Sequence, residues 1–128
     1  MKKFAFIFCL FFSSILSVGI VLAKTSYNIK VPLPGTSKAN TKLQADALIP
    51  VYTAAAVKVP NCNKFSIYDT AIIKQPYDLI KQDGKFVSGF WKEQWAVRAC
   101  GQNVYVPIEF IIEPDETNFV IENSKIHF

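Results

Sequence analysis

The clearest pattern in the chain is an alternation of apolar and polar positions between residues 90 and 112. In its second half every other residue is apolar, namely Val104, Val106, Ile108, Phe110 and Ile112. The first half alternates too, with Trp91, Trp95, Val97 and Ala99 on one face. A period of two places such residues on one side of a β-strand. The two runs therefore predict an antiparallel hairpin with one apolar face.

Gly101 and Gln102 lie between the two runs, and glycine readily adopts the positive φ of a tight turn. A turn there predicts the cross-strand pairs Trp91–Ile112, Trp95–Ile108, Val97–Val106 and Cys100–Asn103. This register brings the two apolar faces together, whereas a slip of one residue would mix apolar with polar positions.

A helix is predicted over residues 41–57. Its apolar stripe consists of Leu43, Ala47, Val51 and Ala55, with Leu48 and Tyr52 beside it. Asn40 or Thr41 can cap the first turn. Pro50 removes a helical hydrogen bond, so we expect either a kink there or a second helix that starts near Ile49. Pro60 and Asn61 end the helix.

The segment after the helix predicts a strand over residues 64–74, ended by Gln75 and Pro76. A short extended piece at 77–81 and a turn at 82–84 follow. Residues 85–99 are expected to form the long strand of the hairpin, with an irregularity near Ser88 and Gly89.

Beyond the hairpin, residues 114–118 predict a turn and residues 118–128 a last strand. Residues 24–40 are expected to be a flexible or extended arm, and 41–128 a single domain. The fold class is therefore α+β: an N-terminal helical segment packed on a four- to five-stranded antiparallel β-meander, with one disulfide. This outline resembles cystatin-like rolls in shape only.

The first 23 residues have the pattern of a secretory signal peptide. Met1–Lys3 is positively charged, the segment from Phe4 to Leu22 is almost wholly apolar, and small residues precede a cleavage site after Ala23. The alternative is an uncleaved membrane anchor, because about 20 apolar residues can span a bilayer.

Composition narrows the classes of partner. The 128-residue chain has a formal charge of +4, and loss of Lys2 and Lys3 with the leader would lower it to +2. The mature chain shows no basic run or basic face, which argues against a nucleic-acid partner. The expected partner is another protein or a small ligand, and the oligomeric state is left open.

Cys62 and Cys100 remain after the leader, and an even number of cysteines in an exported chain predicts a disulfide. This bond would join the end of the helix to the hairpin turn. A redox pair or a metal site would need a C-x-x-C motif or more than the single histidine, His127.

One set of motifs resembles a known group of proteins. Asp69-Thr70, the hairpin residues Trp91, Glu93, Trp95, Cys100 and Gly101, and the apolar strand after them are similar to small secreted proteobacterial proteins of unknown function. The resemblance implies export in a Gram-negative bacterium, to the periplasm or the medium, and it implies no activity.

Trp91, Glu93 and Trp95 are the candidate binding residues, because two indoles and one carboxylate could form a ledge for a ligand. In the alternative, the indoles belong to the core and Glu93 is satisfied by a donor, a cation or solvent. The opposite face carries Lys92, Gln94, Arg98, Tyr105 and Glu109, as either a solvated surface or a surface for docking a protein.

No catalytic residue, metal site or cofactor is predicted, because no nucleophile–base pair or phosphate loop occurs in the sequence. The preferred function is an exported, disulfide-stapled binding protein. One alternative is a small hydrolase in which Glu93 and Asp69 share a cleft. Another is an envelope assembly factor tethered by residues 1–23.

Overall fold

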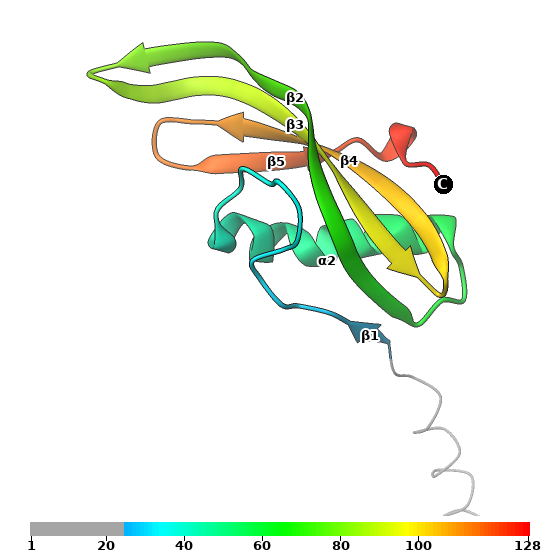
Figure 1. The fold of residues 1–128 in the computed structure, drawn as a ribbon. Coiled ribbons are helices and arrows are strands. Elements are labelled where there is room, and N and C mark those ends of the chain that lie inside the picture. Colours follow the sequence, from blue (N-terminus) through cyan, green and yellow to red (C-terminus); the bar gives the residue numbers. More distant parts are fainter. Residues whose placement is uncertain (1–24) are drawn as a thin grey trace, which may run out of the picture.

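The computed structural model describes residues 25–128 (Figure 1), so the predicted signal peptide lies outside the described residues. Five strands and one helix form the domain. Their bounds are β1 Ser26–Tyr27, α2 Thr41–Lys58, β2 Lys64–Gln82, β3 Lys85–Ala99, β4 Gln102–Ile112 and β5 Thr117–Ile121, followed by a short 3₁₀ turn, η1 Asn123–Lys125.

The strands form one curled sheet in the order β1-β2-β3-β4-β5, and α2 lies across one face of it (Figure 1). β1 pairs parallel to β2, whereas every other pairing is antiparallel. The core lies between α2 and the apolar faces of β3 and β4. The predicted α+β class, a helix on a mostly antiparallel meander, is confirmed.

The helix α2 buries the stripe that the sequence predicts. The side chain of Asn40 accepts a hydrogen bond from the backbone N–H of Leu43 at 2.9 Å, which caps the first turn. The helix continues through Pro50, so the prediction of a second helix near Ile49 is wrong. Both residues are exposed, so the proline ring lies on the solvent side of the helix. Among residues 25–128, no helix has the length and apolarity needed to cross a membrane.

The central hairpin forms between β3 and β4, but the predicted register is wrong by two residues. Trp95 pairs with Val106, and Trp91 pairs with Phe110. The turn residues are Cys100 and Gly101, with φ of 50° and 80°. A two-residue turn with positive φ at both positions matches the twist of the flanking strands. Because the shift is even, every side chain stays on its predicted face.

β2 is longer than predicted, because Gln75 and Pro76 do not end it. Its pairing with β3 jumps from Lys74–Lys92 to Tyr77–Phe90, so Pro76 lies within an irregularity. Beyond Phe65 this strand has no partner on its other side, and an edge tolerates a proline.

The predicted turn at 82–84 is confirmed, with Asp83 and Gly84 between β2 and β3. The predicted last strand is shorter than expected. β5 ends at Ile121, and after η1 only His127 rejoins the sheet, through a bridge to Tyr105.

The far end of the β2–β3 hairpin projects past the rest of the sheet (Figure 1). β3 loses its β4 partner beyond the Gly89–Ile112 pair. We call residues 76–88 the hairpin arm. Gly89, at its base, has φ of 151°, and an added Cβ would collide with the side chain of Leu79. Side chains rarely adopt this positive φ, so the backbone favours a glycine where the two strands of the arm pack together.

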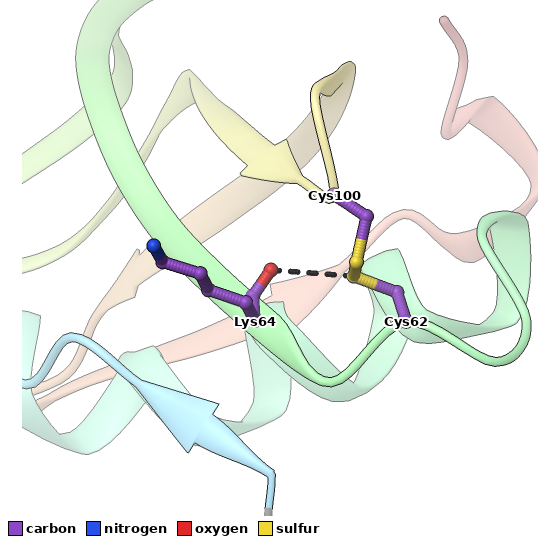
Figure 2. The surroundings of a disulfide bond; sticks show 3 residues. All are labelled: Cys62, Lys64 and Cys100. Carbon is purple, nitrogen blue, oxygen red and sulfur yellow. Dashed lines mark hydrogen bonds between the residues drawn. A yellow bond between two sulfur atoms is a disulfide. The ribbon is translucent and has the colours of Figure 1, made fainter.

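The predicted disulfide joins Cys62 to Cys100, with 5.8 Å between the Cα atoms. Figure 2 shows that the bond connects the segment after α2 to the β3–β4 turn. The carbonyl oxygen of Lys64 lies 3.3 Å from the sulfur of Cys62 and accepts the backbone N–H of Cys100 at 3.4 Å. The helix end and the hairpin turn are thus held together at one end of the sheet.

Candidate functional site

The candidate binding residues form a buried hydrogen-bonded cluster on the helix-facing side of β3. Glu93 and Trp95 are fully buried, and Trp91 is 6% exposed. One carboxylate oxygen of Glu93 accepts the indole N–H of Trp95 at 2.9 Å. The other accepts the indole N–H of Trp91 at 2.7 Å and the backbone N–H of Lys38 at 2.9 Å. Three donors thus offset the cost of burying this carboxylate.

This geometry matches the structural alternative more closely than the ligand ledge. The Trp91 ring stacks on Phe110 with 4.7 Å between centroids, and the Trp95 ring lies 6.3 Å from the same phenyl group. Every buried side-chain nitrogen and oxygen within residues 25–128 has a hydrogen-bond partner. Glu93 is fully buried, so a ligand could reach it only if one of the groups around its carboxylate moved away.

The segment before the helix is fastened to β2 and α2. Thr70 of β2 donates its hydroxyl hydrogen to the carbonyl of Pro34 at 2.8 Å, and it accepts the backbone N–H of Ser37. Gln44 of α2 accepts the backbone N–H of Leu33 at 2.8 Å. An added Cβ at Gly35 would collide with the backbone of Thr70, so a glycine is required at this close approach. Residues 33–39 therefore have a defined place beside the Glu93 cluster.

An apolar groove opens between this segment and the hairpin arm. Its volume is about 360 Å³. It is lined by Lys38, Pro76, Leu79, Phe86, Trp91 and Ile112. Leu79 is 40% and Phe86 41% exposed. Trp91 is the one predicted site residue that reaches this groove, so the groove wall is continuous with the Glu93 cluster.

A larger hollow of about 600 Å³ adjoins the groove, and both are lined by Phe86 and Ile112. This hollow lies between the first turns of α2, the β3 side of the arm next to its turn, and the β4–β5 turn. Its acidic side chains are Asp46, Glu113, Asp115 and Glu116. Lys42 and Lys85 also line the hollow, so it is a polar space of mixed charge that meets the apolar groove at two hydrophobic residues.

The opposite face of the sheet carries a network of charged and phenolic groups. Tyr77 of β2 donates a hydrogen bond of 2.6 Å to Glu109 of β4. This hydrogen bond, with a contribution from desolvation, raises the pKa of Tyr77 to about 12. Lys92 lies 3.8 Å from Glu109 and 3.3 Å from Glu122. The interaction of Glu122 with Lys125, followed by that with Lys92, lowers the pKa of this carboxyl.

The remaining predicted docking residues lie apart from this network. Arg98 lies over the ring of Tyr68, 5.0 Å from its centroid, and the hydroxyl of Tyr68 lies 3.4 Å from that of Tyr105. These side chains are thus occupied with one another, and none of them lines the groove or the larger hollow.

The two carboxylates of the hydrolase alternative are not brought together. Glu93 pairs with Ile72 and Ile108 on the helix-facing side. Asp69 pairs with Ala96. Ala96 is three positions from Glu93 along β3, so the two residues alternate to opposite faces of the strand. The side chain of Asp69 instead accepts the backbone N–H of Thr70 at 2.9 Å. Within residues 25–128, no group of three or more potential ligands is arranged to hold a metal ion.

Most groove residues were missed by the sequence interpretation. Pro76, Leu79 and Phe86 belong to a segment without regular alternation, and Lys38 lies in a loop. The available signal was the unusual number of apolar residues, among them Leu79, Ile80 and Phe86, on both sides of the predicted turn at 82–84. If neither face of this hairpin were buried, these apolar residues would be exposed to solvent.

Comparison with known proteins identifies no relative: no family, curated protein or solved structure matches this chain.

Proposed function

We propose that this protein is an exported, disulfide-stapled binding protein whose ligand occupies the apolar groove beneath the hairpin arm. The observation that carries the proposal is the groove itself, an open apolar space of about 360 Å³ walled by Trp91 and by half-exposed Leu79 and Phe86. Ligand sites are typically concave and mostly apolar, with few polar groups, and this groove has that composition.

The structure around the groove favours binding over a purely structural role. A small domain gains stability by covering apolar side chains, yet here Leu79 and Phe86 of the arm stay about two-fifths exposed over an open groove. The opposite wall is rigid, because Trp91 is fixed by Glu93 and by stacking on Phe110. A preformed wall reduces the ordering cost of binding.

Export is the second part of the proposal. It is supported by the disulfide, which persists in oxidising compartments, and by the signal-peptide pattern of residues 1–23. The intact mass of the protein recovered from its host should correspond to a chain that begins at Lys24. A mass that includes residues 1–23 would instead support the tethered alternative.

Binding can be tested with N-phenyl-1-naphthylamine, a neutral apolar fluorophore. Trp91 and Trp95 are the only tryptophans in the chain, so energy transfer from tryptophan to the probe reports binding to the domain, and the variants then locate the bound probe. We expect saturable transfer with the native protein. Leu79→Asp should weaken binding at least about tenfold, because it places a charge in an apolar site.

Ile49→Asp is the matched control, because Ile49 is 47% exposed on α2 and does not line the groove. It should leave the affinity unchanged. Equal affinity in the native protein and both variants would place the probe elsewhere and remove the groove from the proposal.

A further inference from the structure

We infer that the groove takes an anionic amphiphile, an apolar body with one terminal carboxylate, and that Lys38 supplies the countercharge. The inference rests on the proposed function and names the ligand class of the same site. Five of the six lining residues are apolar, and Lys38 provides the one ionisable side chain.

The position of Lys38 is fixed from within the core. Its backbone N–H donates to the buried carboxylate of Glu93 at 2.9 Å. The next residue, Ala39, is buried, and its carbonyl accepts a hydrogen bond of 3.0 Å from the side chain of Gln44. The lysine stem therefore leaves from a defined point at the groove. In this arrangement Glu93 is a positioning residue, since it acts on the ligand through Lys38.

The ammonium group of Lys38 has no ion-pair partner within residues 25–128. The four ion pairs of this part of the chain use Lys42, Lys92 and Lys125. The acidic side chains nearby line the adjoining hollow and not the groove. A ligand carboxylate would thus meet one unpaired positive charge at the rim of the groove, where Lys38 is exposed and the ion pair is partly screened by water.

The distribution of charge also determines how the ligand would be oriented. No lining residue other than Lys38 offers a charged partner, so a carboxylate placed against Leu79 or Phe86 would lose its hydration without compensation. The acidic head is therefore expected beside Lys38, with the apolar body along the arm. A cationic head would face repulsion from Lys38.

The test is competition between the fluorescent probe and three amphiphiles of equal chain length, below their micellar concentrations. These are decanoate, 1-decanol and decylamine, added to the protein as exported. Decanoate should displace the probe at about fivefold lower concentration than decanol, as expected for one partly exposed ion pair. Decylamine should be the weakest competitor.

Lys38→Gln should reduce the affinity for decanoate to that for decanol, while decanol binding stays unchanged. Lys38→Arg should retain the preference for decanoate. Lys30→Gln is the matched control, because Lys30 is an exposed lysine of the same N-terminal segment that does not line the groove. It should leave all three affinities unchanged.

The outcomes separate this inference from the proposed function. If decanol and decanoate displace the probe equally, the groove is a binding site but the assignment of Lys38 is wrong. If decylamine binds best, the assigned charge is also wrong. If the probe binds but no amphiphile displaces it, this inference is wrong and the proposed function stands. If the probe itself fails to bind, the proposed function is overturned together with this inference.

Discussion

The two ends of the β2–β3 hairpin are built differently. At the disulfide end, β3 pairs with β4 in an unbroken register from Gly89 to Ala99, and the helix covers this sheet face. Toward the arm, the β2–β3 pairing shifts register repeatedly between Ile67 and Lys81, and β3 loses its β4 partner. Strand pairing and core packing are therefore concentrated at one end, and the other end exposes apolar side chains.

The two ends are nevertheless connected. Trp91 belongs to both, since it stacks on core residue Phe110 and also lines the groove. On the opposite face, Tyr77 near the base of the arm is hydrogen-bonded to Glu109 of β4. Substitutions can therefore measure how much each end contributes to the free energy of unfolding.

The largest contrast is expected between Trp95 and Phe86. Trp95→Ala leaves a cavity in the core and removes a donor from Glu93, so it should lower the free energy of unfolding by about 4–5 kcal/mol. Phe86→Ala changes a half-exposed arm residue and should cost about 1 kcal/mol or less. Urea denaturation of both variants measures the difference. Equal losses would mean that the arm belongs to the same packed core.

The disulfide should have the next largest effect. Its 38-residue separation predicts a loss of about 4 kcal/mol in the Cys62→Ser/Cys100→Ser variant, mainly because the unfolded chain becomes less restricted. Denaturation compares this variant with the oxidised protein. The fraction of this variant that remains folded should bind the probe with unchanged affinity, since both cysteines lie at the end of the sheet opposite the arm. A loss below about 1 kcal/mol would show that the bond does not provide the clamp.

Glu93→Gln tests the link between the core and the groove. A neutral amide loses the charge-assisted acceptor, and its NH₂ group must face one of the three donors. We expect a loss of about 2–3 kcal/mol, together with faster hydrogen exchange at the Lys38 amide. Glu113→Gln, an exposed glutamate in the β4–β5 turn, is the matched control and should change neither. Unchanged exchange at Lys38 would show that Glu93 does not position it.

The disulfide end could largely be predicted from the sequence, because burial of one sheet face imposes a visible period of two. That period assigns Trp95 and Val106 to the same face, yet it cannot distinguish registers that differ by two residues. The turn at Cys100 and Gly101 settles the register, and Cys100 is an unusual residue at positive φ.

The arm and the groove could not be predicted in the same way. Pro76 reads as the end of a strand, but an irregular edge strand tolerates it. Lys38, Leu79 and Ile112 come from three distant segments, and only the fold brings them to one groove. Glu93 could be recognised as a buried carboxylate, whereas its backbone partner at Lys38 depends on how the preceding loop lies.

The smallest effect is expected from Tyr77, as a change in pH dependence. Its pKa is raised to about 12 in the folded protein, mainly by the hydrogen bond to Glu109. A tyrosine in the unfolded chain titrates near pH 10. The folded state therefore binds more protons between these values, so the stabilisation is complete below about pH 10 and is lost as the pH rises toward about 12.

Tyr77→Phe should remove this component, so the native protein and the variant should converge in stability as the pH rises through that window. Denaturation at a series of alkaline pH values measures the difference in the free energy of unfolding between the two proteins. Tyr68 and Tyr52, whose pKa values are also raised, titrate in both proteins, so their contributions cancel in this difference. Because Tyr77 connects the base of the arm to β4, hydrogen exchange in residues 76–88 should rise before that in the paired part of β3 and β4, residues 89–112. A difference between the two proteins that stays constant across the alkaline range would exclude the hydrogen bond to Glu109 as the connection between the two ends.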